Sequence, residues 1–469
     1  MQAHIEALKD SKHCPLWLDH EDLPATLPAL QKDEHCELLI VGGGFTGLWA
    51  ALQLKERNPD SDIILIEKTF IGDGASGRNG GFISEDLAHG AENMVQRFPV
   101  EAEKLAELGH QNVKEFLNTL ERYGIDARYE KVGGTEVATD AKYVEYLRQV
   151  YEKNKAAGND VVWFDKEAMQ AEVHSPTYLA GLWYKEGYDG VLDPARLCWG
   201  LKRVLVELGV RIYEQTSLEN FKQLHDKSMQ SECPGGTICS DKIFFATNGY
   251  HSPVAKIRRK VLPVWDYQLA TEPLTDEQLA SIGWNKFRHA LYDNFNMFHY
   301  YRLTQDNRIT WGGGGAVRYY FNSNTDQSCA DIPARFEQLS KEFFETFPQL
   351  SGIKFTHRWS GIIATTTRLC VAPNVGYNGR VSWAVGYTGL GVGAARFGAR
   401  VGLELLGYYP SDVLKMGFVK KFVIPWPFEP LRWIGYKITH RALVKSDANG
   451  GKRGLWLKML DLMGLGFAC

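Results

Sequence analysis

Apolar positions near the start of the chain follow the order of a strand, a helix and a second strand. Residues 38–41 form a continuous apolar run, as in a strand that is buried on both faces. A glycine-rich turn follows at 42–47, and residues 48–52 have the composition of a buried helix. A second apolar run at 63–66 ends on the carboxylate of Glu67. This order predicts a βαβ unit whose turn binds the phosphates of a dinucleotide.

Each glycine of this turn has its own expected role. Gly42 allows the tight turn, Gly44 lets backbone approach a pyrophosphate, and Gly47 lets the helix pack closely on the strand. The phosphates would face the amino terminus of the helix. The carboxylate of Glu67 would accept hydrogen bonds from ribose hydroxyls and repel a 2′-phosphate. NADP is therefore disfavoured, whereas FAD and NAD both remain open.

The rest of the chain alternates between helical and strand patterns. Spaced apolar positions with charged faces predict amphipathic helices within 92–123 and 141–156. Asp193 and Pro194 have the residue types of an N-cap and a first helical position. Further elements are expected as strands at 210–214 and 241–249, a separate β-rich sheet at 261–311, a strand from 381 and a helix at 394–406.

Bulk properties restrict the class of protein. At 469 residues the chain exceeds the size of a single hydrophobic core, so two domains interleaved in sequence are expected. A formal net charge of −3 gives no reason to expect nucleic acid as a partner. The eight cysteines show no C-x-x-C pair, so no metal site is expected. No signal-like start and no run of about 18 apolar residues is seen, which predicts a soluble, cytoplasmic protein.

Several motifs occur in a fixed order, and such a series is far more specific than one glycine-rich turn. Together they resemble the FAD-dependent D-amino-acid-oxidase-like (DAO) superfamily, and most closely its branch of γ-glutamylputrescine oxidases and aminophosphonate oxidoreductases. The likeness spans roughly residues 17–406. It rests on residues 42–49, 74–82, 192–197, 246–250, 270–274 and 386–389.

The resemblance implies an α/β fold with a Rossmann-like FAD-binding domain of glutathione-reductase-like topology. That domain would be assembled from residues 1–95, 186–260 and 355–410. A substrate domain with a mixed α+β sheet is expected from 96–185 and 261–354. The implied reaction is hydride transfer from the carbon next to an amine nitrogen to flavin N5, and the imine then hydrolyses to an aldehyde or ketone. Oxygen commonly reoxidises the flavin in this family, which releases H2O2.

The resemblance also assigns the residues that would bind FAD. They lie in the glycine-rich turn, at the end of the second strand, in a glycine-rich loop, after the strand at 241–249, and around the late glycine-rich helix start. The dipole of that late helix would stabilise negative charge on the flavin. The expected residues are Gly42, Gly44, Phe45, Thr46, Gly47, Glu67, Lys68, Ala75, Ser76, Arg78, Asn79, Gly80, Gly81, Phe82, Thr247, Asn248, Gly361, Gly386, Thr388, Gly389, Leu390 and Gly391.

Departures from the family pattern modify these expectations. In α-amino-acid oxidases the tryptophan-glycine strand carries an arginine that clamps the substrate carboxylate. Ile363 stands at that position here, so a simple α-amino acid is disfavoured. A few positions later, Arg368 replaces the acidic residue that the family usually has there, and it could bind an anionic substrate or support a loop. No tethering cysteine occurs near Gly361 and no histidine near Gly77, so non-covalent FAD is expected. Leu390 replaces a histidine that is frequent in the γ-glutamylputrescine branch.

Candidate substrate residues lie in and after the β-rich segment. His299 and Tyr301 alternate along a predicted strand and should share a face, so one of them is expected to face the pocket. Arg302 and Arg318 could pair with a carboxylate or phosphonate, although surface positions are commoner for arginine. Asp266 could attract a distal ammonium group. The expected partners are a small-molecule amine with a remote anionic group, such as a γ-glutamylated polyamine or an aminophosphonate, and oxygen or another electron acceptor.

The tail at 411–469 combines basic and aromatic residues and is expected to form a helical arm. Such an arm would cover the FAD domain or a neighbouring subunit, or it would contact a membrane surface.

Other classes of protein remain as alternatives. They are a NAD-dependent dehydrogenase, a flavin dehydrogenase that passes electrons to a protein or quinone, and a non-catalytic flavin-binding protein.

Overall fold

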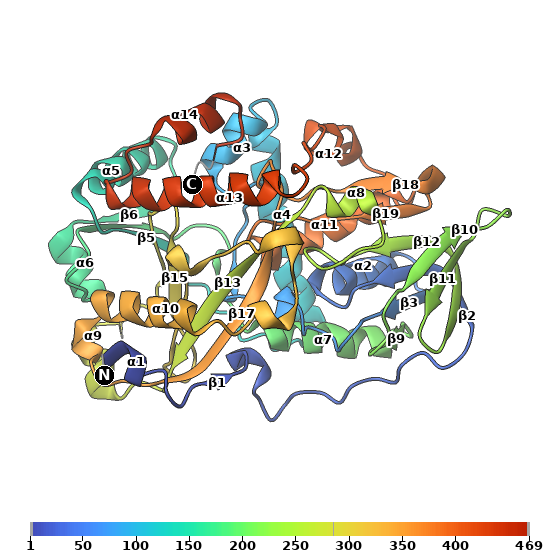
Figure 1. Cartoon of the computed structure of the whole chain (residues 1–469), viewed down its shortest axis with the longest axis horizontal. Coiled ribbons are helices and arrows are strands. Elements are labelled where there is room, and N and C mark those ends of the chain that lie inside the picture. Colours follow the sequence, from blue (N-terminus) through green and yellow to red (C-terminus); the bar gives the residue numbers. More distant parts are fainter. Residues whose placement is uncertain (1–2, 285, 467–469) are drawn as a thin grey trace.

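The computed structural model describes residues 3–284 and 286–466, and its strands form two main sheets side by side (Figure 1). The smaller sheet contains the predicted βαβ unit. Parallel strands run in the order β9, β3, β2, β12 and β19, and β10 and β11 extend β12 in antiparallel fashion. The bounds are β2 (Glu34–Val41), β3 (Ile63–Ile66), β9 (Arg211–Tyr213), β10 (Asn220–Gln223), β11 (Met229–Cys233), β12 (Gly236–Phe245), β18 (Asn374–Gly376) and β19 (Val381–Trp383).

Four helices pack around this smaller sheet through buried apolar side chains, among them Trp49 and Phe116. Close approach is possible because Gly47 has no side chain, since a Cβ there would lie 2.0 Å from the carbonyl oxygen of Gly42. The N-cap prediction is confirmed, because the Asp193 carboxylate accepts hydrogen bonds from the N–H groups of Ala195 and Arg196. The helices are α2 (Phe45–Arg57), α4 (Ala102–Arg122), α7 (Pro194–Glu207) and α11 (Gly391–Leu405).

The larger sheet has nine strands and both parallel and antiparallel neighbours. Its order is β1, β17, β13, β16, β15, β14, β5, β7 and β6. The bounds are β1 (Lys12–His13), β5 (Gly134–Ala138), β6 (Val161–Phe164), β7 (Ala180–Tyr184), β13 (Leu262–Thr271), β14 (Ala290–Asp293), β15 (His299–Leu303), β16 (Ile309–Gly313) and β17 (Phe355–Thr365). A small third sheet joins β4 (Phe82–Ile83) to β8 (Gly190–Val191).

Helices cover the larger sheet unequally. Apolar side chains of α10 pack on one face, and α5 covers part of the other face. The predicted helix at 141–156 matches the bounds of α5. The helices of this part are α1 (Ala3–Glu6), α5 (Ala141–Ala156), α6 (Lys166–Glu172), α9 (Asp276–Ile282) and α10 (Pro333–Thr346). The short helices α3 (Ala91–Arg97) and α8 (Ala255–Arg258) pack on the smaller-sheet half instead, where Met94 and Ile257 are buried.

Two placements differ from the expected domain boundaries. Helix α4 falls in the predicted substrate segment, yet it packs against α11 and α2. Its apolar stripe includes Phe116, and the centroid of that ring lies 4.9 Å from the ring centroid of Trp49 on α2. Strand β17 falls in the predicted FAD segment, yet it pairs along its length with β13 in the larger sheet. The chain therefore crosses between the halves at these two elements.

The C-terminal arm consists of α12 (Gly417–Lys420), α13 (Leu431–Ala448) and α14 (Leu455–Leu462). It starts on the cofactor half, where Phe418 packs against Phe98 and Phe397. It then runs over the larger-sheet half, with α14 near α5 and α3 (Figure 1). None of the helices in the described ranges is both long and apolar enough to cross a membrane.

Candidate functional site

A continuous cavity of about 2570 Å³ lies between the two halves and extends to the arm. One wall comes from the carboxyl ends of β2, β3 and β12, which is the edge where open α/β sheets bind ligands. The opposite wall is a face of the larger sheet. Residues of the glycine-rich segments 42–47 and 74–82 line the cavity between these walls, so a ligand bound to one wall can contact the other.

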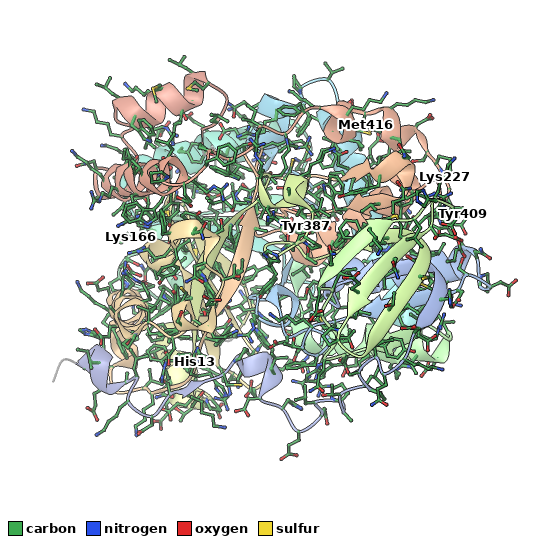
Figure 2. The ribbon with its side chains drawn as sticks, turned by 45° about the vertical axis from the view of Figure 1, so that its right-hand side comes forward. His13, Lys166, Lys227, Tyr387, Tyr409 and Met416 are labelled. Atoms are coloured by element: carbon green, nitrogen blue, oxygen red, sulfur yellow. The ribbon has the colours of Figure 1, made fainter. Side chains whose placement is uncertain are left out.

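The first glycine-rich turn has the geometry that a dinucleotide requires. Gly42 has φ +113°, and a Cβ there would lie 2.8 Å from the carbonyl oxygen of Ala246. The N–H of Phe45 donates to the hydroxyl of Ser76 at 2.9 Å, which ties the start of α2 to the second glycine-rich loop. Thr46 donates to the hydroxyl of Tyr387, a residue near the middle of the molecule (Figure 2).

Glu67 lies at the end of β3 and lines the cavity together with Lys68. Its carboxylate accepts hydrogen bonds from the N–H of Gly43 at 2.7 Å and from the N–H of Thr69 at 3.0 Å. Burial raises the pKa of this carboxyl, although these hydrogen bonds oppose the shift. The acid thus braces the phosphate-binding turn in addition to facing the position expected for a ribose.

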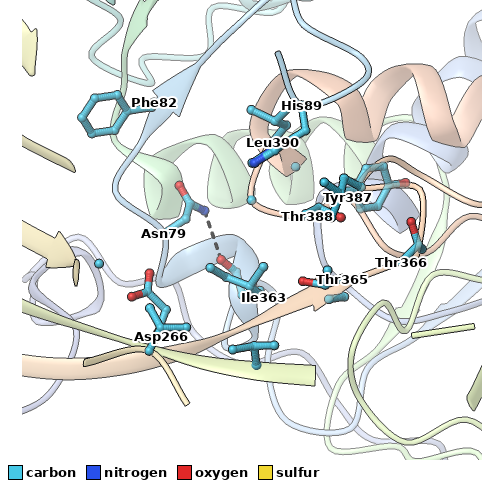
Figure 3. Close-up of a pocket in the computed structure, with 18 of the residues that line it drawn as sticks. Asn79, Phe82, His89, Asp266, Ile363, Thr365, Thr366, Tyr387, Thr388 and Leu390 are labelled. Atoms are coloured by element: carbon cyan, nitrogen blue, oxygen red, sulfur yellow. Dashed lines mark hydrogen bonds between the residues drawn. The ribbon is translucent and has the colours of Figure 1, made fainter. Parts of the chain in front are cut away.

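The second glycine-rich loop is held in shape by its own polar side chains. Arg78 pairs with Asp73 at 2.8 Å, and the amide of Asn79 donates to the carbonyl oxygens of Ala75 and Ser76 (Figure 3). The Asn79 carbonyl also accepts from the N–H of Gly81 at 2.9 Å. Ala75, Ser76, Arg78, Asn79, Gly80 and Phe82 all line the cavity, whereas Gly81 does not. The loop therefore presents mainly backbone and an aromatic ring to a ligand.

The remaining expected cofactor residues meet on the far side of the cavity. The side chain of Asn248 accepts a hydrogen bond from the N–H of Gly386 at 2.9 Å, which joins the end of β12 to the turn before α11. The hydroxyl of Thr247 is buried and makes no hydrogen bond to any other described residue. Its orphaned donor suits a polar ligand. Thr247, Asn248, Gly361, Thr388, Gly389, Leu390 and Gly391 line the cavity.

His89 is a cavity residue that the sequence analysis did not identify. It comes from the segment before α3, and Figure 3 shows it beside Leu390. Burial lowers the pKa of its imidazole, so the ring is neutral near pH 7. A histidine thus lies next to the leucine that replaces the histidine of the resembling branch. No local sequence signal links these two segments.

Alternation along the strands of the larger sheet decides which side chains face the cavity. Tyr300 on β15 lines the cavity, together with Tyr292 on β14 and Glu136 on β5, and their pairing places these three side chains in one row. His299 and Tyr301 share the opposite face, as expected, where both stack on Trp311. Neither residue is among those that line the cavity. The expectation that one of them faces the pocket therefore differs from the structure by one strand position.

His299 has a structural environment instead. Its two ring nitrogens lie 2.7 Å from Asp293 and 2.9 Å from Glu342. Burial lowers the pKa of His299, but the two carboxylates outweigh it and raise the pKa to about 10. The imidazolium therefore connects β14 and β15 to α10 as a buried cation between two acids.

We expect His299→Gln to destabilise the protein by roughly 2–4 kcal/mol near pH 7. The pKa of His299 is raised above its unfolded value of about 6.5, so its contribution is full below that pH and is lost as pH rises towards about 10. Thermal unfolding at pH 7 and pH 10 should show the gap between wild type and variant closing. His440→Gln is the matched control, because burial lowers the pKa of His440 to about 4 and leaves it neutral throughout. A gap of constant size would contradict this account.

The three arginines considered as ligands of an anionic substrate hold structure together. Arg302 donates to the carbonyl oxygens of Gly80 and Leu192, so it fixes the second glycine-rich loop. Arg318 donates to the carbonyl oxygen of Val317 and contacts α13 through His440. Arg368 donates to the carbonyl oxygen of Val371 and stacks on Phe98 and Phe418, which is the loop-supporting alternative. None of the three lines the cavity.

Asp266 and Tyr300 form a polar pair on the cavity wall. The Tyr300 hydroxyl donates to the Asp266 carboxylate, and its path across β16 is open because Gly312 has no side chain. A Cβ at position 312 would lie 2.7 Å from the Tyr300 oxygen. Burial raises the pKa of Asp266 to about 6, although the hydrogen bond from Tyr300 opposes this. Phe82 packs edge-on against Tyr300 at 5.7 Å, so an acid lies beside aromatic rings.

Comparison with known proteins agrees with this geometry. A family model described as FAD dependent oxidoreductase (DAO) matches residues 37–405, and the chain belongs to this family. FAD is therefore its cofactor, and the NAD-dependent alternative is excluded. The predicted fold class is confirmed as well.

Named relatives cover most of the chain. It is 28% identical over 399 residues to "Probable oxidoreductase OrdL" of Haemophilus influenzae, which covers 83% of this chain and 87% of the relative. It is also 28% identical over 388 residues to "Gamma-glutamylputrescine oxidoreductase" of Escherichia coli, which covers 81% and 86%. The crystal structure of L-proline dehydrogenase from P. horikoshii has a TM-score of 0.64 at 20% identity and covers 83% of this chain and 96% of that one.

Proposed function

We propose that this enzyme oxidises the C–N bond of a primary or secondary amine, and that the product imine hydrolyses to an aldehyde or ketone. Non-covalent FAD would supply the hydride acceptor, and oxygen as final acceptor would yield H2O2. The observation that carries the proposal is the buried acid Asp266, held by Tyr300 on the wall across from the glycine-rich loops.

The Asp266 carboxylate can attract a substrate ammonium group in the low-dielectric cavity. Its raised pKa, about 6, also brings it closer to the range in which a carboxylate can take a proton from the amine before oxidation. The faces of Phe82 and Tyr300 would add cation–π attraction and exclude water. Ile363, on β17 near Asp266 in Figure 3, presents an apolar side chain where an α-carboxylate would need a cation.

The outer parts of the cavity wall favour a γ-glutamyl head group over a phosphonate. Lys142 lines the cavity near the arm, and the buried acids Glu136 and Asp189 also line it. Burial raises the pKa of Glu136 to about 7 and that of Asp189 to about 6. A γ-glutamyl group carries both a carboxylate and an ammonium, so it can satisfy both signs of charge. The name of the Escherichia coli relative supports the same substrate class.

Anaerobic mixing with candidate amines tests this proposal. The oxidised-flavin absorbance band should bleach with a γ-glutamylated diamine, and more slowly with the free diamine or an aminophosphonate. α-Amino acids serve as the control and should leave the band unchanged. Oxygen uptake compared with reduction of a soluble quinone then separates an oxidase from a dehydrogenase. A yellow protein that no amine bleaches would contradict amine oxidation.

A further inference from the structure

The C-terminal arm exposes an unusual amount of apolar surface. Of the twenty large hydrophobic residues that are exposed in the described ranges, eleven lie between positions 422 and 463. Monomeric soluble proteins rarely keep large contiguous apolar patches, and such patches mark sites of interaction. The six most exposed of the eleven are Phe422, Phe428, Leu431, Leu455, Leu462 and Met463.

Basic residues surround these apolar side chains. Residues 420–466 contain nine lysines and arginines and three carboxylates, a net charge of +6. All three carboxylates are bound within the protein. Glu429 accepts from the hydroxyl of Tyr319, Asp447 accepts from the N–H groups of residues 296 and 297, and Asp461 pairs with Arg453. Two of these carboxylates are held by neutral donors of the protein and one is paired with a cation of the arm, so the segment keeps an excess of positive charge.

Helix α13 separates this surface from the cavity. Ile434 and Ile438 are exposed at helical spacing, and Lys437, Arg441 and Lys445 are interleaved with them. Leu431 is also exposed but lines the cavity, so it lies at the edge of this face. The other side of the helix, including Gly435 and Tyr436, lines the cavity. Apolar and basic residues thus share the exposed side of α13. Helix α14 adds the exposed side chains of Leu455, Met459 and Leu462 together with Lys458, and we call the exposed residues of both helices the outer face of the arm.

We propose that the outer face of α13 and α14 binds the surface of an anionic phospholipid bilayer. Apolar side chains would enter the boundary between headgroups and acyl chains, while lysines and arginines would pair with lipid phosphates. A second copy of the chain fits less well, since two such basic faces repel each other. Because α13 also lines the cavity, this binding places the substrate cavity next to the lipid surface. The inference does not depend on which amine is oxidised.

Sedimentation of the full-length holoenzyme with vesicles tests this inference. Wild type should bind vesicles of phosphatidylcholine mixed with phosphatidylglycerol, bind vesicles of phosphatidylcholine alone at least tenfold more weakly, and lose affinity as salt rises. The variant Leu455→Glu with Leu462→Glu should bind anionic vesicles at least tenfold more weakly. These side chains are 89% and 91% exposed, so their replacement should not change the melting temperature.

Val206→Glu is the matched control, since Val206 is an exposed aliphatic residue on α7, far from the arm in Figure 1. It should bind vesicles like wild type. The proposal is overturned if wild type ignores anionic vesicles at physiological salt, or if the double variant binds them equally well. It is also overturned if wild type stays off vesicles and sediments as a dimer that the double variant abolishes. Each outcome is read without turnover, so it is independent of the proposed reaction.

Discussion

Replacing Asp266 with asparagine should lower kcat/KM for the amine by roughly 30- to 1000-fold while FAD stays bound. Asparagine keeps the shape of the side chain but removes the buried negative charge that would hold the substrate ammonium. Loss of one partner from such a buried charged contact costs about 2–4 kcal/mol. Steady-state kinetics give the loss, and the visible spectrum confirms that the flavin is retained.

The pH profile adds a signature that a merely structural role would not produce. With a pKa of about 6, Asp266 gains its charge as pH rises from 5 to 7, so wild-type kcat/KM should rise over that range. Tyr300→Phe removes the hydrogen bond that favours the charged form, and should move this rise to higher pH. Asp266→Asn should lack the rise. Unchanged kcat/KM in Asp266→Asn would remove Asp266 from substrate binding.

Replacing Gly42 with alanine should yield protein with little or no bound FAD. The added methyl group would lie 2.8 Å from the carbonyl oxygen of Ala246, at a residue whose φ of +113° already disfavours a side chain. The end of β12 would have to move away from β2, and Thr247 would move with it. The ratio of flavin absorbance to protein absorbance measures the loss, and addition of FAD to the purified variant measures the weaker affinity.

Gly407→Ala separates steric contact from backbone strain. Gly407 also has a positive φ, +88°, but a Cβ there would meet no atom within 4 Å. This control should lose only about 1 kcal/mol of stability and keep full flavin content. If both variants retain FAD equally, the close approach of β2 and β12 is not needed to hold the cofactor.

The cofactor half could be predicted because its chemistry depends on backbone. Gly42 and Gly47 are required wherever a helix must approach a strand end this closely, and Glu67 follows its strand directly, so a local pattern reveals all three. The boundaries were harder, because α4 and β17 cross between halves. Their partners, α11 and β13, are distant in sequence, and no local pattern names them.

The substrate wall could be predicted only in part. Tyr300 and Tyr301 are neighbours of the same type, and a change of one position in the strand exchanges the two faces. What decides between them is packing: Trp311 and Phe343 bury one face of the sheet, and the glycine-rich loop covers the other. His89 could not be found from sequence at all, because only the folded chain brings it beside Leu390.

The absence of a side chain at Gly312 controls how this wall of the cavity is built. Tyr300 reaches Asp266 only because the residue between them lacks a side chain, and Gly80 leaves similar space on the other side of the same ring. One added methyl group at either glycine would clash with the Tyr300 ring, turn it and break its hydrogen bond to Asp266. A single substitution at Gly312, which does not line the cavity, would therefore change how the acid is held without replacing any cavity-lining residue.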